Sequence, residues 1–515
     1  MFGYFGLGGI VFDLAFFQTI GLMKEQALSV VPLFIFMGYV VEQAGLMERL
    51  LRAFQVILAP VRGSLYIGVI LTATVFAMAN GIVGAAVPVA VLYNFFLDHF
   101  IAGFTVGAIK WPPAPGGGNR GAGIVDSHRG RHLESERLPG LPPSLEECMA
   151  VAVAAPPLLR DRRLLAIWEK VRNNIRLSPE DGLALFETED LHGLGRMADF
   201  AKSRLHGERV FFVLNRYVNP TNVCVLSCSF CDFARKKGEE GAFENSIEDV
   251  LEMIKPGTRE AHIVGGHHPD WPFEYYERLI AAIHAARPET QIKAFTAAEI
   301  DYLWRRWKIE PREALTRLKK AGLRSMPGGG AEIFSARLQK ALHYTGKADA
   351  DRWLEIHGIA HSLGIKTNAT MLYGHIETMA ERVEHLVRLR EQQDKSGGFL
   401  TFIPLAYQVG TTKLVPRQTP PTDDLRTIAA SRLLLDNFPH IEAYWVMIGE
   451  ETASVALNFG ASDVNGTLED EKIAHMAQAE SPPGLAQEQI LRMIRDAGKV
   501  AVERDALYNV VKVWY

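Results

Sequence analysis

The chain has 515 residues, enough for more than one domain, and its four cysteines are too few for a disulfide-rich scaffold. Its 55 Lys and Arg residues against 59 Asp and Glu residues give a formal net charge of −4. Because a chain this close to neutral has no basic excess, we expect no nucleic-acid partner.

The N-terminal part, residues 1–104, is strongly apolar. It holds few of the basic residues, and the run from Gly63 to Leu97 has no charged residue at all. That run exceeds the ~20 apolar residues that cross a bilayer, so we expect an all-α, membrane-type segment. Ser29–Gly38, Ala44–Leu46 and Asn80–Val87 resemble the start of the large permease subunit of TRAP-type carboxylate transporters. Since the resemblance covers only a fragment of that subunit, the segment is either a membrane anchor or a fused or misjoined reading frame, and we favour the second.

Residues 105–157 have the composition of a linker. Pro112–Gly118 and Leu138–Pro143 are rich in proline and glycine, and the residues between them are rich in Arg, Gly and Ser. No helical or strand periodicity survives there, so we predict a disordered segment and give Cys148 no role.

The pattern of an α/β enzyme begins at residue 158. Ser178, Pro179 and Asp181 form a helix start signal, and helical patterns then alternate with apolar segments. Such alternation predicts a parallel sheet, open or closed into a barrel, with chemistry at the carboxyl ends of its strands. The predicted strands are 210–215, 262–266, 292–295, 366–371 and 399–403. The predicted helices are 163–175, one starting at Pro179, 192–206, 246–254, 273–287, 311–321, 334–342, 349–363 and 378–392.

Three cysteines follow the first predicted strand. Cys224, Cys228 and Cys231 have the spacing Cys-x3-Cys-x2-Cys, with Phe230 just before the last. An odd number of clustered cysteines makes a disulfide framework improbable, and no fourth ligand for a structural zinc lies nearby. Three thiolates can hold a 4Fe-4S cluster whose fourth iron stays open to a substrate. We predict such a cluster, with these cysteines as its ligands.

Other polar groups follow later strands. Gly265 and Gly266 end the second strand and allow close approach of a ligand, and His268 beside them is a candidate acid or base. Glu299 follows the third strand and could bind ribose hydroxyls. Glu332 comes directly after the run Gly328–Ala331, and His375 follows the fourth predicted strand. Near the C-terminus, 444–451 and 458–463 are expected to close the barrel and line the substrate pocket.

The cysteine spacing resembles that of the radical S-adenosylmethionine (SAM) enzymes, which implies that the open iron chelates SAM. Phe230 would lie near the adenine, and the turn at Gly265 and Gly266 would contact the SAM amino group. Residues 158–515 more narrowly resemble the aminodeoxyfutalosine synthases of the futalosine route to menaquinone. The resemblance is carried by 183–194, 219–231, 265–274, 295–301, 328–334, 371–378 and 431–466.

This resemblance implies a radical SAM (β/α) barrel. It also implies that SAM is consumed as its 5′-deoxyadenosyl radical adds to 3-[(1-carboxyvinyl)oxy]benzoate, giving 6-amino-6-deoxyfutalosine, bicarbonate and methionine. The expected site then has His268, Glu332 and His375 as catalytic residues, with Phe230, Gly265, Gly266, Glu299 and Glu332 at the cofactor. Arg235, Lys293, Arg324 and His375 are the candidate partners of the substrate carboxylates.

Three alternatives stay open at this point: the sister radical SAM cyclase of the same pathway, a transport component, and an electron-transfer iron–sulfur protein. A radical SAM enzyme needs an electron donor such as flavodoxin or ferredoxin, and its oxygen-sensitive cluster predicts a cytoplasmic catalytic domain. Membrane association is expected only if residues 1–104 are expressed.

Overall fold

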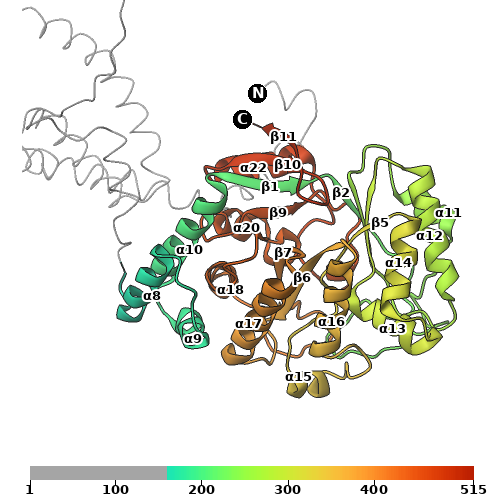
Figure 1. Cartoon of the computed structure of the whole chain (residues 1–515), viewed down its shortest axis with the longest axis horizontal. Helices are drawn as coiled ribbons and strands as arrows, with labels where there is room; N and C mark the ends of the chain where they lie inside the picture. The colour runs from blue at the N-terminus through green and yellow to red at the C-terminus, as the bar shows by residue number, and fades with distance from the viewer. Residues whose placement is uncertain (1–158, 515) are drawn as a thin grey trace, which may run out of the picture. The chain divides into compact units, whose positions relative to one another are not determined.

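The structure is a computed structural model that describes residues 159–514 (Figure 1). The predictions for residues 1–104 and 105–157 therefore lie outside the described residues. None of the helices within 159–514 combines the length and the apolar character that crossing a membrane requires.

The centre of the fold is a curled, seven-stranded half-barrel in which all neighbouring strands are parallel. Its strands follow one another in chain order: β2 (Asn215–Val218), β3 (Glu260–Ile263), β4 (Gln291–Ala294), β5 (Leu323–Met326), β6 (Lys366–Tyr373), β7 (Phe399–Ala406) and β8 (His440–Ile441). The α/β class and all five predicted strand regions are confirmed. The strands β5 and β8 of this sheet were not predicted, and neither were β9, β10 and β11 of the second sheet described below.

A second sheet of four strands joins the two edges of the half-barrel. Its order is β11 (Val510–Trp514), β10 (Val500–Arg504), β1 (Arg209–Val213) and β9 (Asp463–Gly466), with only β11 antiparallel. The predicted strand 210–215 is in fact two strands, since the chain changes sheet at Leu214. At the other edge, Glu442 after β8 pairs in parallel with Asp463 of β9.

Helices connect the strands and cover the half-barrel (Figure 1). They are α8 (Arg162–Arg172), α9 (Pro179–Glu187), α10 (Leu191–His206), α11 (Ile247–Met253), α12 (Phe273–Ala286), α13 (Ala297–Trp307), α14 (Pro311–Ala321), α15 (Ala336–Ala341), α16 (Ala350–Ser362), α17 (Met379–Ser396), α18 (Pro421–Leu434), α19 (Trp445–Ile448), α20 (Glu450–Ala456), α21 (Ile473–Met476) and α22 (Gln487–Asp496).

Helix starts follow the capping rules that the sequence indicated. Ser178 and Asp181 form a reciprocal capping box at α9, with Pro179 in the first turn. Thr296 and Glu299 form the same box at α13, and Thr378 and Glu381 at α17. Residues 297–302, for which no helix was predicted, are therefore helical, and Glu299 satisfies the exposed backbone amide of Thr296.

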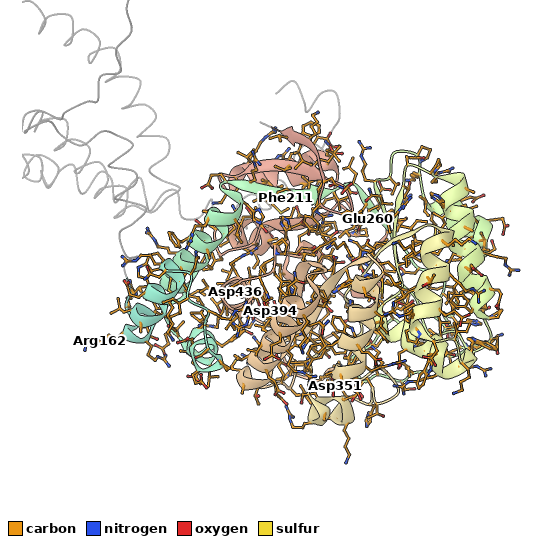
Figure 2. All side chains as sticks on the ribbon, viewed as in Figure 1. Arg162, Phe211, Glu260, Asp351, Asp394 and Asp436 are labelled. Carbon is orange, nitrogen blue, oxygen red and sulfur yellow. The ribbon has the colours of Figure 1, made fainter. Side chains whose placement is uncertain are left out.

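The N-terminal helices pack on the C-terminal half of the domain. Helix α9 contacts α17 and α18, and α10 runs along α18. Arg176, just before α9, bonds to Asp394 at 2.5 Å and to Asp436 at 2.8 Å, which are labelled close together in Figure 2. This arginine fastens the N-terminal helices to the ends of α17 and α18.

Buried charges pair within each sheet and also link the two sheets beneath the site, where Arg504 of β10 lies 3.9 Å from Glu260 of β3. Lys293 Nζ lies 2.8 Å from Glu260, and Arg504 Nε lies 2.6 Å from Asp463. All four side chains are at most 3% exposed, so each charge depends on its partner. Lys293 thus forms a buried ion pair with Glu260, and its role in the barrel is structural.

Candidate active site

The cysteine loop follows β2 and is held by backbone hydrogen bonds. Cys224 N donates to the Arg235 carbonyl at 2.9 Å, and Arg235 N donates to Asn222 at 2.9 Å. The loop is also hydrogen-bonded to the turn after β3, because Val225 N donates to the His267 carbonyl at 3.0 Å. These bonds place Cys224, Cys228 and Cys231 at the carboxyl ends of β2 and β3.

The three thiols fit an iron–sulfur cluster. All are free, and they act electrostatically on one another. Burial raises the pKa of Cys228 to about 11 and also raises that of Cys231, so these thiols need a cationic partner to ionise. The amides of Phe233 and Ala234 hydrogen-bond to Cys231 and favour its thiolate, as donors around cluster sulfurs do.

Within residues 159–514 no group of three or more His, Cys, Asp or Glu side chains is arranged to hold a single metal ion. A cubane cluster requires a different arrangement of ligands, because each of its cysteines binds a different iron and the sulfurs are spaced around the cluster. A cluster with three protein ligands therefore fits this loop, because the thiols are free, interact with one another and have amide donors at Cys231.

A cavity of about 290 Å³ opens beside the cysteine loop and extends over the half-barrel interior. Five of the predicted site residues line it: Phe230, Cys231, Gly265, Glu299 and Glu332. The cavity also reaches the strands on the opposite side, β7 and β8, through Tyr407 and Tyr444. Of the two C-terminal segments expected to line the pocket, 444–451 reaches the cavity through Tyr444 and Met447, whereas no residue of 458–463 lines it.

The glycine turn after β3 fits closely under the cysteine loop. A Cβ at Gly266 would stand 2.2 Å from the Val223 carbonyl oxygen, and Gly266 N donates to Thr221 at 2.9 Å. Gly266 is therefore required by its contact with the cysteine loop, whereas Gly265 is the residue of the pair that faces the cavity. Close approach of a ligand, which was predicted for both glycines, therefore remains a reason for Gly265 alone.

Glu299 is both a helix cap and a cavity residue. Its Oε2 accepts hydrogen bonds from Thr296 N at 2.7 Å and Thr296 Oγ1 at 2.9 Å. Burial raises the pKa of Glu299 to about 7, even though these bonds and one from Gly265 favour the carboxylate. The structure thus fixes the position of this carboxyl group at the cavity wall.

Glu332 is paired with a lysine that the sequence analysis missed. Lys347 Nζ lies 2.5 Å from Glu332 Oε1 and 5.1 Å from the ring centre of Phe230. Glu332 itself has a φ of 45°, and its carbonyl accepts a hydrogen bond from Leu372 N at 2.8 Å. No motif surrounds Lys347, which lies in the connection between α15 and α16, so the sequence held no signal for it.

The two candidate histidines do not line the cavity. His268 Nδ1 accepts hydrogen bonds from Asp270 N and Trp271 N, both at 3.1 Å, and its ring stacks on Trp271. The neighbouring His267 lines the cavity instead, with a pKa that burial lowers to about 3. His268 orders the turn after β3.

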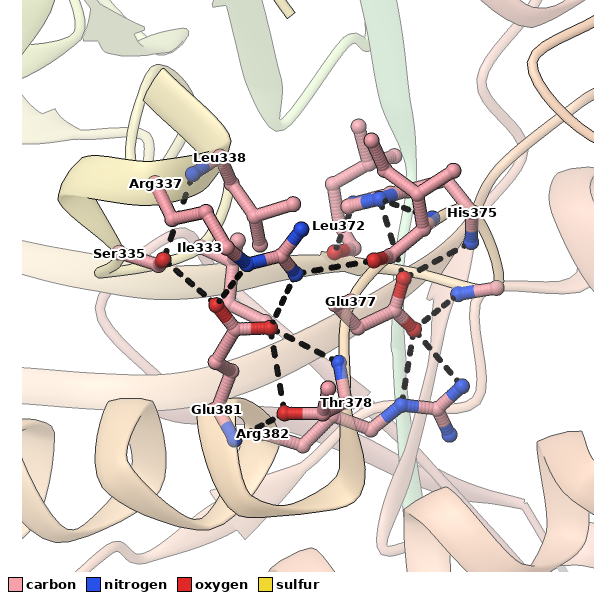
Figure 3. A network of polar contacts seen from close by, with 12 residues as sticks. Ile333, Ser335, Arg337, Leu338, Leu372, His375, Glu377, Thr378, Glu381 and Arg382 are labelled. Atoms are coloured by element: carbon pink, nitrogen blue, oxygen red, sulfur yellow. Dashed lines mark hydrogen bonds and ion pairs between the residues drawn. The ribbon is translucent and has the colours of Figure 1, made fainter. Parts of the chain in front are cut away.

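His375 belongs to the polar network that includes Glu377 and Arg382 (Figure 3). Its Nε2 donates to the Leu372 carbonyl at 3.1 Å and its Nδ1 accepts from Ile376 N at 2.8 Å, so both ring nitrogens are used. Glu377 accepts from the amides of Gly374 and His375 at 2.6 and 2.9 Å. The polar run 373–378, which suggested a site, builds a turn and the start of α17.

The predicted cationic partners of substrate carboxylates lie elsewhere. Arg235 donates to the carbonyls of Asp232 and Ala234 at 2.7 and 2.9 Å, and Arg324 is exposed. Among the described residues that line the cavity, Lys347 is the only lysine or arginine. Sequence reasoning also missed several polar lining residues that occupy inward-facing strand positions or directly follow a strand, among them Tyr217, Asn368, Thr370 and Glu442. Their signal is a polar residue in or beside an otherwise apolar strand.

Comparisons with known proteins agree with this geometry. Residues 218–389 match the radical SAM superfamily, and residues 396–514 match the CofH/MqnC C-terminal region. The structure superposes on methylornithine synthase (PylB) with a TM-score of 0.53 at 17% identity, covering 65% of this chain and 96% of that one. The [FeFe]-hydrogenase maturase HydG gives a TM-score of 0.53 at 18% identity, covering 70% of this chain and 80% of that one. The fold and the cysteine loop define a radical SAM enzyme.

The sequence relatives are more specific. The chain is 48% identical to aminodeoxyfutalosine synthase of Thermus thermophilus, over 69% of this chain and 98% of that protein. It is 42% identical to aminodeoxyfutalosine synthase of Streptomyces coelicolor, over 67% and 93%. It is also 37% identical to cyclic dehypoxanthine futalosine synthase of S. coelicolor, over 67% and 88%. The chain belongs to the aminodeoxyfutalosine synthase family.

Proposed function

We propose that the protein joins the 5′-deoxyadenosyl part of SAM to 3-[(1-carboxyvinyl)oxy]benzoate. In this reaction SAM, the acceptor and water give 6-amino-6-deoxyfutalosine, methionine, bicarbonate and a proton. The observation that carries the proposal is the 48% identity to the T. thermophilus synthase over 98% of that protein's length. The cavity that borders Cys231, the glycine turn and the half-barrel interior is consistent with it.

The cysteine loop provides the first part of the chemistry. Cys224, Cys228 and Cys231 would hold a 4Fe-4S cluster, which when bound supplies the electron that splits SAM into methionine and the 5′-deoxyadenosyl radical. Phe230 and Gly265 line the cavity beside these cysteines and are the proposed SAM contacts. We also retain Glu299 and Glu332 as SAM ligands, because both carboxyl groups lie in the same wall.

The second task of the protein is to orient the acceptor and to exclude water. The cavity wall opposite the glycine turn is largely apolar, with Leu372, Ile403 and Leu405 from β6 and β7. Such a wall excludes water, presents no thiol from which a radical could take a hydrogen atom, and helps to orient the reacting carbons. His268 and His375 are not part of this wall, and we assign them no catalytic role.

The test is an anaerobic assay of the full chain. The cluster is reconstituted, and SAM labelled with ¹³C in the ribose, dithionite and the enolpyruvyl benzoate are added before mass spectrometry. We expect one product that contains the labelled ribose and the benzoate ring. Labelled free 5′-deoxyadenosine as the sole nucleoside product would overturn the proposal.

A second candidate is the sister cyclase reaction of the same pathway. It is favoured by the 37% identity to cyclic dehypoxanthine futalosine synthase over 88% of that protein. In the same assay with dehypoxanthine futalosine in place of the enolpyruvyl benzoate, labelled free 5′-deoxyadenosine formed together with the cyclised product would favour the cyclase.

A pure electron-transfer role predicts no SAM binding. We expect SAM to bind the reconstituted protein and Cys228→Ala to abolish that binding. Cys148→Ala is the matched control, since Cys148 has no predicted role. Because the cluster needs a strong reductant such as flavodoxin or ferredoxin, we propose that the catalytic domain works in the cytoplasm.

A further inference from the structure

The part of the cavity wall formed by Tyr217, His262, Asn368, Glu442 and Tyr444, which we call the inner wall, has no role in the chemistry described so far. These residues come from β2, β3, β6 and the segment after β8, and all line the cavity. The inner wall contains no lysine or arginine. It is built instead from aromatic rings and uncharged hydrogen-bonding groups.

Three side chains of the inner wall are buried with a polar atom that has no hydrogen-bond partner among the described residues: His262 at its Nδ1, and the pair Glu442 and Asn368. Glu442 is 0% exposed and Asn368 is 2% exposed. Glu442 Oε1 accepts a hydrogen bond from Asn465 Nδ2 at 2.7 Å, but within residues 159–514 its Oε2 has no hydrogen-bond partner. Asn368 Oδ1 is unpartnered as well. Buried polar atoms without partners are rare in folded proteins, and here all three belong to residues at a cavity.

The surroundings of Glu442 favour the protonated form of its carboxyl group, which can donate a hydrogen bond. Burial raises its pKa to about 8, and Asp463 adds to the shift, whereas Arg504 and Lys293 oppose it. Tyr217, Tyr444 and Tyr508 also interact with it electrostatically. Because Oε1 already accepts from Asn465, the proton belongs on Oε2, the atom that has no partner.

Flat rings accompany these polar atoms. The rings of Tyr217 and His262 lie with their centres 4.2 Å apart at an angle of 30°, and the hydroxyls of Tyr217 and Tyr444 are hydrogen-bonded. Burial lowers the pKa of His262 to about 3, so its imidazole is neutral. A planar aromatic ligand with one hydrogen-bond-accepting substituent matches this combination of surfaces.

We propose that the inner wall is the acceptor subsite and binds the benzoate end of the substrate, with Glu442 Oε2 donating a hydrogen bond to the ring carboxylate. Asn368, whose amide can present either its oxygen or its nitrogen, hydrogen-bonds to the same group. This inference rests on the proposed function. It explains how a site without a free cation binds a carboxylate: a neutral carboxyl donor replaces the usual arginine.

The experiment measures binding to the full chain with its cluster reconstituted, in the absence of reductant. The probes are 3-methoxybenzoate, which has the ring, the ether oxygen and the carboxylate, and 3-methoxytoluene, which lacks the carboxylate. Glu442→Leu is expected to weaken 3-methoxybenzoate binding at least tenfold and to leave 3-methoxytoluene and SAM within twofold. Glu442→Gln keeps a donor and is expected to bind 3-methoxybenzoate within about threefold of the wild type at pH 7.

The pH supplies a second, independent measurement. The wild type is expected to lose affinity for 3-methoxybenzoate between pH 7 and 9, as Glu442 ionises, while Glu442→Gln does not. Asp424→Asn is the matched control, because Asp424 is also a buried carboxyl with a raised pKa but does not line the cavity. Its affinity for the probe should stay within twofold of the wild type.

Several outcomes would overturn the inference. One is wild-type affinity for 3-methoxybenzoate in Glu442→Leu, and another is an equal loss for both probes. A loss of SAM affinity with unchanged probe affinity would assign the inner wall to the adenosyl group. If the wild type forms the labelled adduct in any of these cases, the proposed function stands and only the subsite is wrong. If 3-methoxybenzoate binding depends on Glu442 but no adduct forms, the aromatic-acid subsite is supported and the proposed reaction is wrong.

Discussion

Lys347 Nζ lies 2.5 Å from Glu332 Oε1, and each side chain is less than 15% exposed. Burial alone would lower the pKa of Lys347, but its attraction to Glu332 and Cys228 raises it. The lysine therefore remains charged beside two of the three cluster cysteines, since it also favours the thiolate of Cys231. This pair places one fixed positive charge beside the cysteine loop, in the lining of the cavity.

Replacing Lys347 with methionine should change both redox behaviour and stability. Loss of the positive charge near the cysteines should move the cluster reduction potential to a more negative value, measured by an EPR-monitored redox titration. The unpaired Glu332 should lower the free energy of unfolding by about 3 kcal/mol. Lys347→Arg, which keeps the charge, is the control for the potential. An unchanged or more positive potential in Lys347→Met would contradict this reading of the pair.

Gly266→Ala should displace the cysteine loop. Its new Cβ would meet the Val223 carbonyl oxygen at 2.2 Å, which is backbone and cannot turn away. We expect a loss of about 2–3 kcal/mol in unfolding free energy and less iron bound per chain after reconstitution. Gly358→Ala is the control, because the nearest atom there is the mobile end of Gln392 at 3.1 Å. Its stability should stay within about 1 kcal/mol of the wild type. Normal iron loading in Gly266→Ala would show that the loop tolerates the contact.

Two arginines of the network in Figure 3 should differ strongly in their contribution to stability. Arg382 is 4% exposed and contacts Glu377 at 2.8 Å and Asp423 at 3.0 Å. Arg382→Met leaves Glu377 buried without its cation and should cost about 3–5 kcal/mol in urea unfolding.

Arg337 is 53% exposed and contacts Glu381 at 2.7 Å. Arg337→Ala should therefore cost no more than about 1 kcal/mol. Similar losses for the two variants would mean that burial does not determine the contribution of these pairs.

Asp424 should make the stability of the domain depend on pH. It accepts a hydrogen bond from Tyr373 at 2.7 Å, and burial raises its pKa to about 7 from 3.8. Between these values the native state holds a proton that the unfolded chain has released, so stability must fall as the pH rises. From pH 5 to pH 7 we expect Asp424 to remove on the order of 2 kcal/mol.

The measurement is urea unfolding of the wild type and of Asp424→Asn at both pH values. The variant should lack this part of the decrease. An identical decrease in the two proteins would assign the pH dependence to other groups.

Much of the fold followed from local patterns, and much of the site did not. The cap at Ser178 and the periodicity of 246–254 or 349–363 are local properties, and the corresponding helices α9, α11 and α16 are present. The short strands β5 and β8 and the C-terminal strands depend on pairing with distant partners, which no local pattern reports.

The same distinction applies to the site. Phe230, Cys231 and Glu332 were predicted because they lie in a motif or beside one, and they line the cavity. Lys347 and Glu442 reach it only through tertiary structure. Conversely, the polar residues at 373–378 were predicted to belong to the site. They form a turn and a helix start, which use the same residue types as a site does.

The position of β1 has a consequence for how the protein is made. This strand, Arg209–Val213, lies between β10 and β9. Its two edges can therefore form their hydrogen bonds only after residues 463–466 and 500–504 have been made. During synthesis the half-barrel strands β2 to β8 can pair in order as they leave the ribosome, but β1 must stay unpaired until almost the whole chain has been translated. A nascent chain that stops before β9 would expose an apolar strand, Val-Phe-Phe-Val, on both edges, and it is a natural target for chaperones and proteases.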